Sequence, residues 1–96
     1  MRLKNSFWAM LRPEKTYAPE ELVEEIRQAM LATLEAHCGK GQLNMEAEIA
    51  FASDLGGLWY LRPKLLYVIA LASSEKLANR ELRNITVLFV GHFPGA

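Results

Sequence analysis

The sequence contains a single cysteine, Cys38, among its 96 residues. One cysteine cannot form a disulfide bond within the chain, and proteins without disulfides are typical of reducing compartments. The basic N-terminus is followed by an apolar segment, residues 7–11. This segment is shorter than the apolar region of roughly 7–15 residues that a secretory signal peptide contains. We therefore expect a cytoplasmic protein.

The chain also has no excess of charge, because eleven basic residues balance eleven acidic ones. A formal net charge of zero gives no overall attraction to nucleic acid or to an anionic membrane. The charges are unevenly distributed, however. Residues 1–15 carry four basic and one acidic residue, and residues 16–37 carry one basic and five acidic residues. These oppositely charged segments, within one chain or on two partner chains, would attract one another, but only weakly in ordinary salt.

Long hydrophobic runs are absent. The longest uncharged apolar run, residues 65–72, is far shorter than the roughly 20 residues of a membrane span. Its periodicity fits a buried helix or a buried strand equally well. Pro63 favours a helix, since proline is well tolerated in the first helical turn. Ser73 and Ser74 end the run and can cap the next element. We predict a helix over residues 63–73, buried on nearly every side, and no membrane span.

Residues 16–38 show the clearest helical pattern of the chain. Four apolar residues recur at i+4: Leu22, Ile26, Met30 and Leu34. Pro19 lies in the first turn, and glutamates crowd the N-terminal half, where the helix dipole favours anions. Gly39 ends the helix. We predict that the glutamate row is a solvated face.

Residues 43–52 are ambiguous between helix and strand. Leu43, Met45 and Ile49 belong to a strict apolar alternation, which is the period of a strand. Methionine, glutamate and alanine nevertheless prefer helix, and Met45 and Ile49 also satisfy helical spacing. We favour a helix over residues 44–61, bent at Gly56 and Gly57.

The last predicted helix covers residues 74–91. Its apolar residues follow helical spacing at positions i, i+4, i+7 and i+11: Ala78, Leu82, Ile85 and Phe89. Residues 85–90 could instead form a strand, and residues 43–51 would then be its natural partner. Gly91 and Pro94 end the element in either case.

Together these elements predict a single all-α domain over residues 1–96. It is a small bundle of about four helices with an aromatic N-terminal arm, residues 1–15. The alternative is an α+β fold with a two-stranded pairing of residues 43–51 and 85–90.

One part of the sequence resembles a known group of proteins. The segment Trp59-Tyr60-Leu61-Arg62-Pro63 is followed by Leu82, Ile85, Leu88-Phe89, Gly91 and Pro94. This pattern resembles small uncharacterised proteobacterial helical proteins and covers roughly the second half of the chain. The resemblance implies a helical fold and a bacterial source. It implies no activity and carries over no functional residues.

No group of residues predicts catalysis, a cofactor or a metal. His37 and Cys38 are adjacent, so on a helix their side chains diverge by about 100°. One cysteine and two histidines supply too few ligands for a zinc site. The segment Gly39-Lys40-Gly41 lacks the remaining residues of a phosphate loop. We therefore do not expect an enzyme.

A basic helical side is the weakest of the candidate sites. Lys76, Arg80 and Arg83 share one side of the last predicted helix, but Glu75 and Glu81 dilute their charge. Domains that bind DNA usually carry a clear excess of positive charge. We do not expect a nucleic-acid partner, and these three residues are the candidates for one.

The apolar segments exceed what one small domain readily covers. Exposed apolar patches mark association, and aromatic residues and arginine are enriched at interfaces. We therefore expect a homodimer or a subunit bound to another protein, although the same aromatic residues are also ordinary core residues. The candidate interface residues are Phe7, Trp8, Trp59, Tyr60, Arg62, Val87, Leu88 and Phe89.

The expected function is a non-enzymatic interaction or regulatory module. Two other classes stay open: a nucleic-acid-binding regulator that uses a weakly basic helix, and a binder or enzyme of a small ligand. An interaction module predicts apolar interface burial, and a ligand binder predicts a pocket with converging polar groups.

Overall fold

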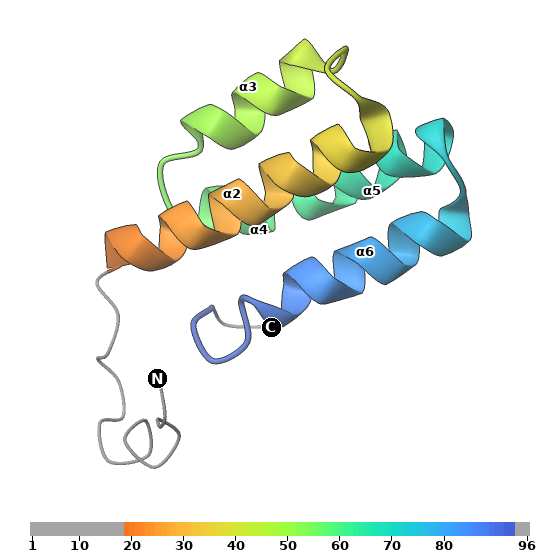
Figure 1. Cartoon of the computed structure of the whole chain (residues 1–96). Coiled ribbons are helices and arrows are strands. Elements are labelled where there is room, and N and C mark those ends of the chain that lie inside the picture. Colours follow the sequence, from red (N-terminus) through yellow and green to blue (C-terminus); the bar gives the residue numbers. More distant parts are fainter. Residues whose placement is uncertain (1–18, 94–96) are drawn as a thin grey trace.

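In the computed structural model, residues 19–93 are described and form an all-α fold (Figure 1). The helices are α2 (Pro19–Cys38), α3 (Leu43–Phe51), α4 (Leu55–Trp59), α5 (Arg62–Ala72) and α6 (Glu75–Val87). Residues 19–93 contain no strand, so the all-α prediction is confirmed and the pairing of residues 43–51 with 85–90 is wrong. The predicted arm, residues 1–15, lies outside the described residues.

Helix α2 organises the molecule. It contacts α3, α4, α5 and α6, and Figure 1 shows it between α3 on one side and α6 on the other. The apolar stripe predicted on α2 faces this packing, and Ile26 and Met30 are completely buried. The core also receives Leu65 and Ile69 from α5 and Phe89 from the turn after α6. Burial of this stripe against its neighbours explains why α2 is the longest of the described helices.

The range predicted as one helix, residues 44–61, is helical over α3 and α4, but the chain leaves the helix after Phe51 instead of bending at Gly56 and Gly57. Ala52 is extended, and the carboxylate of Asp54 accepts a 2.8 Å hydrogen bond from the backbone N–H of Gly57. This N-cap starts α4 as a separate helix. The two glycines therefore lie inside α4 and do not form the bend. A Cβ on Gly57 would lie 3.3 Å from the Cβ of Ala52, so glycine allows the close return of the chain.

A contact from α2 holds the end of α3. The Nη1 atom of Arg27 donates hydrogen bonds to the carbonyl oxygens of Ile49 (2.8 Å), Ala50 (3.0 Å) and Ala52 (2.8 Å). The last carbonyls of a helix have no partner within the helix. A cation placed there satisfies them and also interacts favourably with the negative end of the helix dipole. Arg27 thus supplies the C-terminal cap of α3 from another element.

Helices α5 and α6 form an antiparallel hairpin. Pro63 lies in the first turn of α5, as predicted. At the other end of the helix, the backbone N–H and the hydroxyl of Ser73 both donate hydrogen bonds to the carbonyl oxygen of Ile69. The hydroxyl of Ser74 accepts a 3.1 Å hydrogen bond from the N–H of Leu77 and caps α6. The α6 helix ends at Val87, and not at residue 91, because turns replace the helical bonding from Leu88 onward.

Helix α5 is not buried on nearly every side, and that prediction is wrong. Leu65 and Ile69 are completely buried, but 64% of Tyr67 and 71% of Leu71 are exposed. The reason is geometric, since α5 packs mainly against α6 and α2, and these helices leave the side with Tyr67 and Leu71 exposed. None of the helices in residues 19–93 combines the length and apolar character that crossing a membrane requires.

Candidate functional site

A cluster of aromatic rings joins the end of α4 to the end of the described chain. The ring centroids of Trp59 and Phe89 are 5.0 Å apart at 75°, and those of Trp59 and Phe93 are also 5.0 Å apart. Edge-to-face and offset contacts of this kind stabilise beyond the burial of area. Phe89 is completely buried, so its assignment to an interface is corrected to the core. Helical spacing from Ala78 continues to Phe89 even though the helix itself ends earlier.

Arg62 is held against this cluster. Its guanidinium carbon lies 3.4 Å from the centroid of the Trp59 ring, and its Nε donates to the Trp59 carbonyl at 3.1 Å. Its Nη1 donates to the hydroxyl of Thr86 on α6 at 2.8 Å. No carboxylate of the described residues pairs with it, and partial burial lowers the pKa of Arg62 below its ordinary value. The result is a fixed, partly desolvated cation without a counter-charge in residues 19–93.

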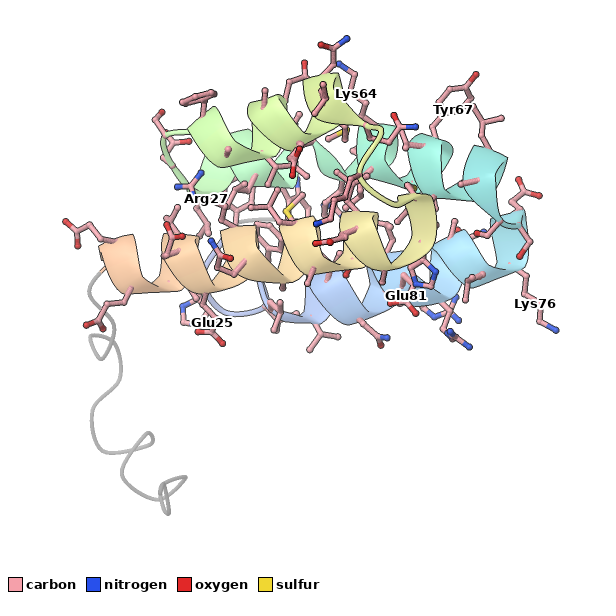
Figure 2. All side chains as sticks on the ribbon, turned by 45° about the horizontal axis from the view of Figure 1, so that its top comes forward. Glu25, Arg27, Lys64, Tyr67, Lys76 and Glu81 are labelled. Atoms are coloured by element: carbon pink, nitrogen blue, oxygen red, sulfur yellow. The ribbon has the colours of Figure 1, made fainter. Side chains whose placement is uncertain are left out.

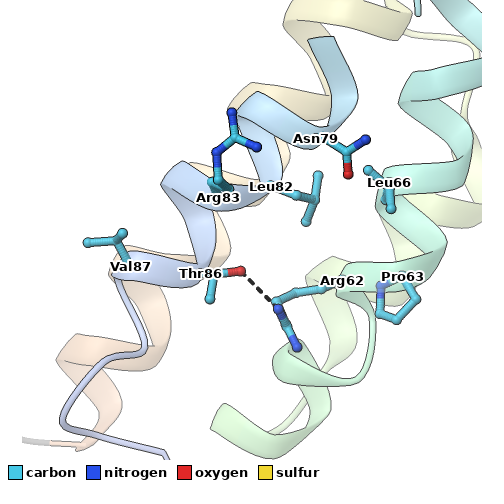
Figure 3. A pocket seen from close by; sticks show the side chains of 8 residues that line it. All are labelled: Arg62, Pro63, Leu66, Asn79, Leu82, Arg83, Thr86 and Val87. Atoms are coloured by element: carbon cyan, nitrogen blue, oxygen red, sulfur yellow. Dashed lines mark hydrogen bonds between the residues drawn. The ribbon is translucent and has the colours of Figure 1, made fainter. Parts of the chain in front are cut away.

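A groove of about 510 Å³ runs between α5 and α6 beside Arg62 (Figure 3). Leu66 and Leu82 lie between the two helices, and Arg62 reaches from the start of α5 toward Thr86. The residues that line the groove are Arg62, Pro63, Leu66, Asn79, Leu82, Arg83, Thr86 and Val87. The groove therefore combines an apolar floor with two arginines.

The three basic residues predicted on the last helix are brought together by the structure. Lys76, Arg80 and Arg83 line a shallow depression of about 220 Å³ on α6. Arg80 forms an ion pair with Glu81 at 3.1 Å. Arg83 also lines the α5–α6 groove, and no ion pair or hydrogen bond ties it to another described residue. The basic side of α6 thus continues into the groove.

Helix α3 carries a second feature, which was not predicted from the sequence. Its outward side, opposite the buried Met45 and Ile49, carries four apolar residues, which the exposed Asn44, Glu46 and Glu48 flank. We name this side the α3 stripe; it consists of Leu43, Ala47, Ala50 and Phe51. Phe51 is 84% exposed. The spacing of Leu43, Ala47 and Phe51 at i, i+4 and i+8 was visible in the sequence, but it coincides with the apolar alternation that favours a strand.

The remaining predicted interface residues are divided between surface and interior. Tyr60 and Val87 are exposed, whereas Trp59, Arg62 and Leu88 are half-buried. Phe7 and Trp8 lie outside the described residues. The predicted set therefore does not form one continuous exposed patch, because its aromatic centre packs on itself.

His37 and Cys38 point to different neighbours, as adjacent helical residues do. The Nε2 atom of His37 lies 3.6 Å from a carboxylate oxygen of Glu81. The thiol of Cys38 donates to the carbonyl of Val68 at 3.8 Å, and burial raises its pKa above the ordinary value. In residues 19–93, no three His, Cys, Asp or Glu side chains are grouped so that they could hold a metal ion.

Cys38 should therefore react slowly with thiol reagents. The thiolate is the reactive form, and burial disfavours it. At pH 8 we expect iodoacetamide to modify the folded protein several-fold more slowly than the unfolded chain. Mass spectrometry of timed samples, with and without guanidinium chloride, measures both rates. Equal rates would contradict this.

Comparison with known proteins finds no matching family model, no similar curated protein and no similar solved structure.

Proposed function

We propose that the protein is a non-enzymatic interaction module that works as a homodimer, and that α3 forms the contact between the copies. The observation that carries this proposal is the α3 stripe. A helix with apolar residues on both faces typically has a second packing partner. Here Met45 and Ile49 face the core, while Leu43 and Phe51 face outward without a partner in residues 19–93.

The α3 stripe is complementary to a second copy of itself. It places two large side chains at the ends of the helix, Leu43 and Phe51, and two alanines between them. When two α3 helices cross in antiparallel fashion at Ala47, Leu43 of one copy lies opposite Phe51 of the other. The alanines allow the helix axes to approach closely. Such a contact is isologous and closes at two copies, as in most homodimers.

The surroundings of the stripe suit this pairing. Glu48, beside the stripe, is neutralised by Lys64 of α5, whose Nζ lies 2.8 Å away. This ion pair brings the exposed side of α5 next to α3, and Figure 2 shows Lys64 and Tyr67 extending from the same side of the molecule. Tyr67 and Leu71 of α5 are also exposed, so the helix that carries Lys64 offers further apolar surface.

The size of the stripe limits the strength of the dimer. Phe51 follows Leu43 by eight positions, which corresponds to about 12 Å of helix. This is short for an interface of standard size, which covers roughly 800 Å² on each partner. We expect a reversible dimer with a dissociation constant of about 1–100 µM.

The proposed setting is the cytoplasm of a bacterium, supported by the lone, half-buried Cys38 and by the sequence resemblance.

Replacing Phe51 by serine tests the proposal. Because Phe51 is 84% exposed, the variant should fold normally but lose the largest side chain of the contact. In light scattering coupled to size exclusion, we expect the wild type to shift from the monomer mass of 10.8 kDa toward twice that value as its concentration rises. The variant should stay monomeric to at least tenfold higher concentration.

The matched control is Tyr60→Ser, which removes an exposed aromatic side chain away from α3. We expect it to dimerise like the wild type. A wild-type protein that is purely monomeric at about 200 µM, or two variants with equal effects, would remove α3 as the dimer contact.

A further inference from the structure

The α5–α6 groove has a charge pattern that differs from the rest of the described surface. Among residues 20–93, four basic residues have a carboxylate partner: Arg27, Lys40, Lys64 and Arg80. In residues 20–93, no ion pair joins a carboxylate to Arg62, Lys76 or Arg83. Two of these three cations, Arg62 and Arg83, line the groove. The groove therefore brings two unpaired cations next to the apolar side chains of Leu66, Leu82 and Val87.

We infer that the α5–α6 groove binds an acidic segment of a partner protein, with a carboxylate at Arg62 and Arg83 and an aliphatic side chain on Leu66 and Leu82. This inference does not depend on the dimer proposal. The dimer proposal concerns α3 and a second copy of the chain, whereas this inference concerns the α5–α6 groove and a different protein.

The guanidinium of Arg62 is held in a fixed orientation that suits the binding of a carboxylate. Stacking on Trp59 and the hydrogen bonds to the Trp59 carbonyl and to Thr86 fix the plane of its guanidinium. These bonds use Nε and Nη1, so the N–H groups of Nη2 have no acceptor among the described residues. Arginine binds carboxylates through its planar fork, and a fixed fork loses little conformational entropy on binding. The lowered pKa of Arg62 agrees with a cation whose burial no anion compensates.

The shape of the groove favours a peptide over a small molecule. The groove is open along its length, and its lining on α6 extends from Asn79 to Val87, or about 12 Å of helix. Sites for small ligands usually enclose most of the ligand surface. Grooves between two helices instead accept an amphipathic segment, whose apolar residues at i and i+4 are its anchors.

The lining also favours a peptide over a nucleic acid. Proteins that bind single strands offer aromatic faces on which bases stack. None of the eight lining residues is aromatic, and Trp59 is covered by Arg62 and Phe93. Leu66, Leu82 and Val87 would have no role in binding a phosphate backbone.

The test uses synthetic peptides and the full chain. A set of acetylated 12-residue peptides carries two leucines at i and i+4 and one glutamate placed at successive positions around them. Each is titrated into ¹⁵N-labelled protein at low salt, and the backbone amides of Leu66, Leu82 and Thr86 are followed by NMR. We expect saturable shifts at these amides with at least one peptide. Its glutamine counterpart should bind at least about fivefold more weakly.

The protein variants separate the groove from the general charge of α6. Arg83→Gln removes a groove cation that has no partner in residues 20–93, and Lys76→Gln removes an equally unpaired cation outside the groove. We expect Arg83→Gln to weaken binding at least about fivefold and Lys76→Gln less than about twofold. The same titration in a Phe51→Ser chain should give unchanged affinity, so that failure of the dimer proposal is distinguished from failure of this one.

Three results would overturn the inference. The first is the absence of saturable shifts with every peptide of the set. The second is an equal loss of affinity in Arg83→Gln and Lys76→Gln. The third is tighter binding of a single-stranded oligonucleotide than of any peptide, which would identify α6 as a nucleic-acid-binding helix.

Discussion

Phe89→Ala is expected to lower the free energy of unfolding by about 3–5 kcal/mol, because the ring is completely buried and its removal leaves a cavity. The ring contacts Trp59 edge-to-face at 5.0 Å, so the aromatic cluster loses its centre. For a chain of this size the midpoint of thermal unfolding should fall by roughly 15–30 °C. Circular dichroism during heating measures it.

The size of this destabilisation, and whether it depends on protein concentration, show whether Phe89 belongs to the core or to an interface between copies. Destabilisation by Phe89→Ala should be the same at low and high protein concentration, since the ring stabilises a single copy. Val87→Ala is the matched control, because Val87 is exposed on the preceding turn, and it should change stability by less than about 0.5 kcal/mol. Should the substitution change only the oligomeric state and leave the unfolding midpoint in place, Phe89 would belong to an interface after all.

Arg27→Met should lower the free energy of unfolding by about 1.5–3 kcal/mol, since hydrogen bonds from a charged group are removed and helix-end carbonyls lose their partner. Methionine keeps much of the buried stem of the arginine side chain, so the loss reports mainly on the guanidinium. Three carbonyls are affected, those of Ile49, Ala50 and Ala52. Chemical unfolding with urea measures the change.

The control for Arg27 is Glu24→Gln, which removes the ion pair at 3.1 Å and leaves the contacts to α3 in place. Glu24 is exposed, and its pKa is lowered by the hydrogen bonds from Gln28 and then Arg27. Exposed pairs of this kind contribute little. We expect the urea unfolding curve of Glu24→Gln to overlay that of the wild type. In Arg27→Met, amide hydrogen exchange should become faster in α3 than in the other helices. If the protection of the α3 amides were the same as in the wild type, Arg27 would not be a cap of α3.

Local sequence patterns were sufficient for the two helices that dominate the core. On α2, the spacing of Leu22 and Ile26 predicted which side is buried, and Gly39, at φ +71°, follows its end. On α6, Ala78 and Leu82 did the same, and Ser74 caps the start of the helix as predicted. These predictions succeed because an amphipathic period and a cap depend on residues only a few positions apart.

The middle of the chain could not be predicted in the same way. The break between α3 and α4 depends on Asp54, which is a local signal, and on Arg27, which lies 22–25 residues away from the carbonyls it holds. The α3 stripe was hidden because its residues satisfy a strand period and a helix period at once. The α5–α6 groove could not be predicted from the sequence either, because it forms only where α5 and α6 pack side by side.

The spacing of apolar residues along the chain decided which residues of α2 and α6 face inward, and residue preferences favoured helix over residues 43–52 and 63–73, where the spacing was ambiguous. Tertiary packing decided which apolar residues stay outside: Phe51 and Tyr67 are exposed, whereas Phe89 is buried in an aromatic cluster. The physical reason is that hydrophobicity gives each residue a preference for burial but does not say how many neighbours are available. In a small bundle, α3 and α5 each have a side that no other described helix covers.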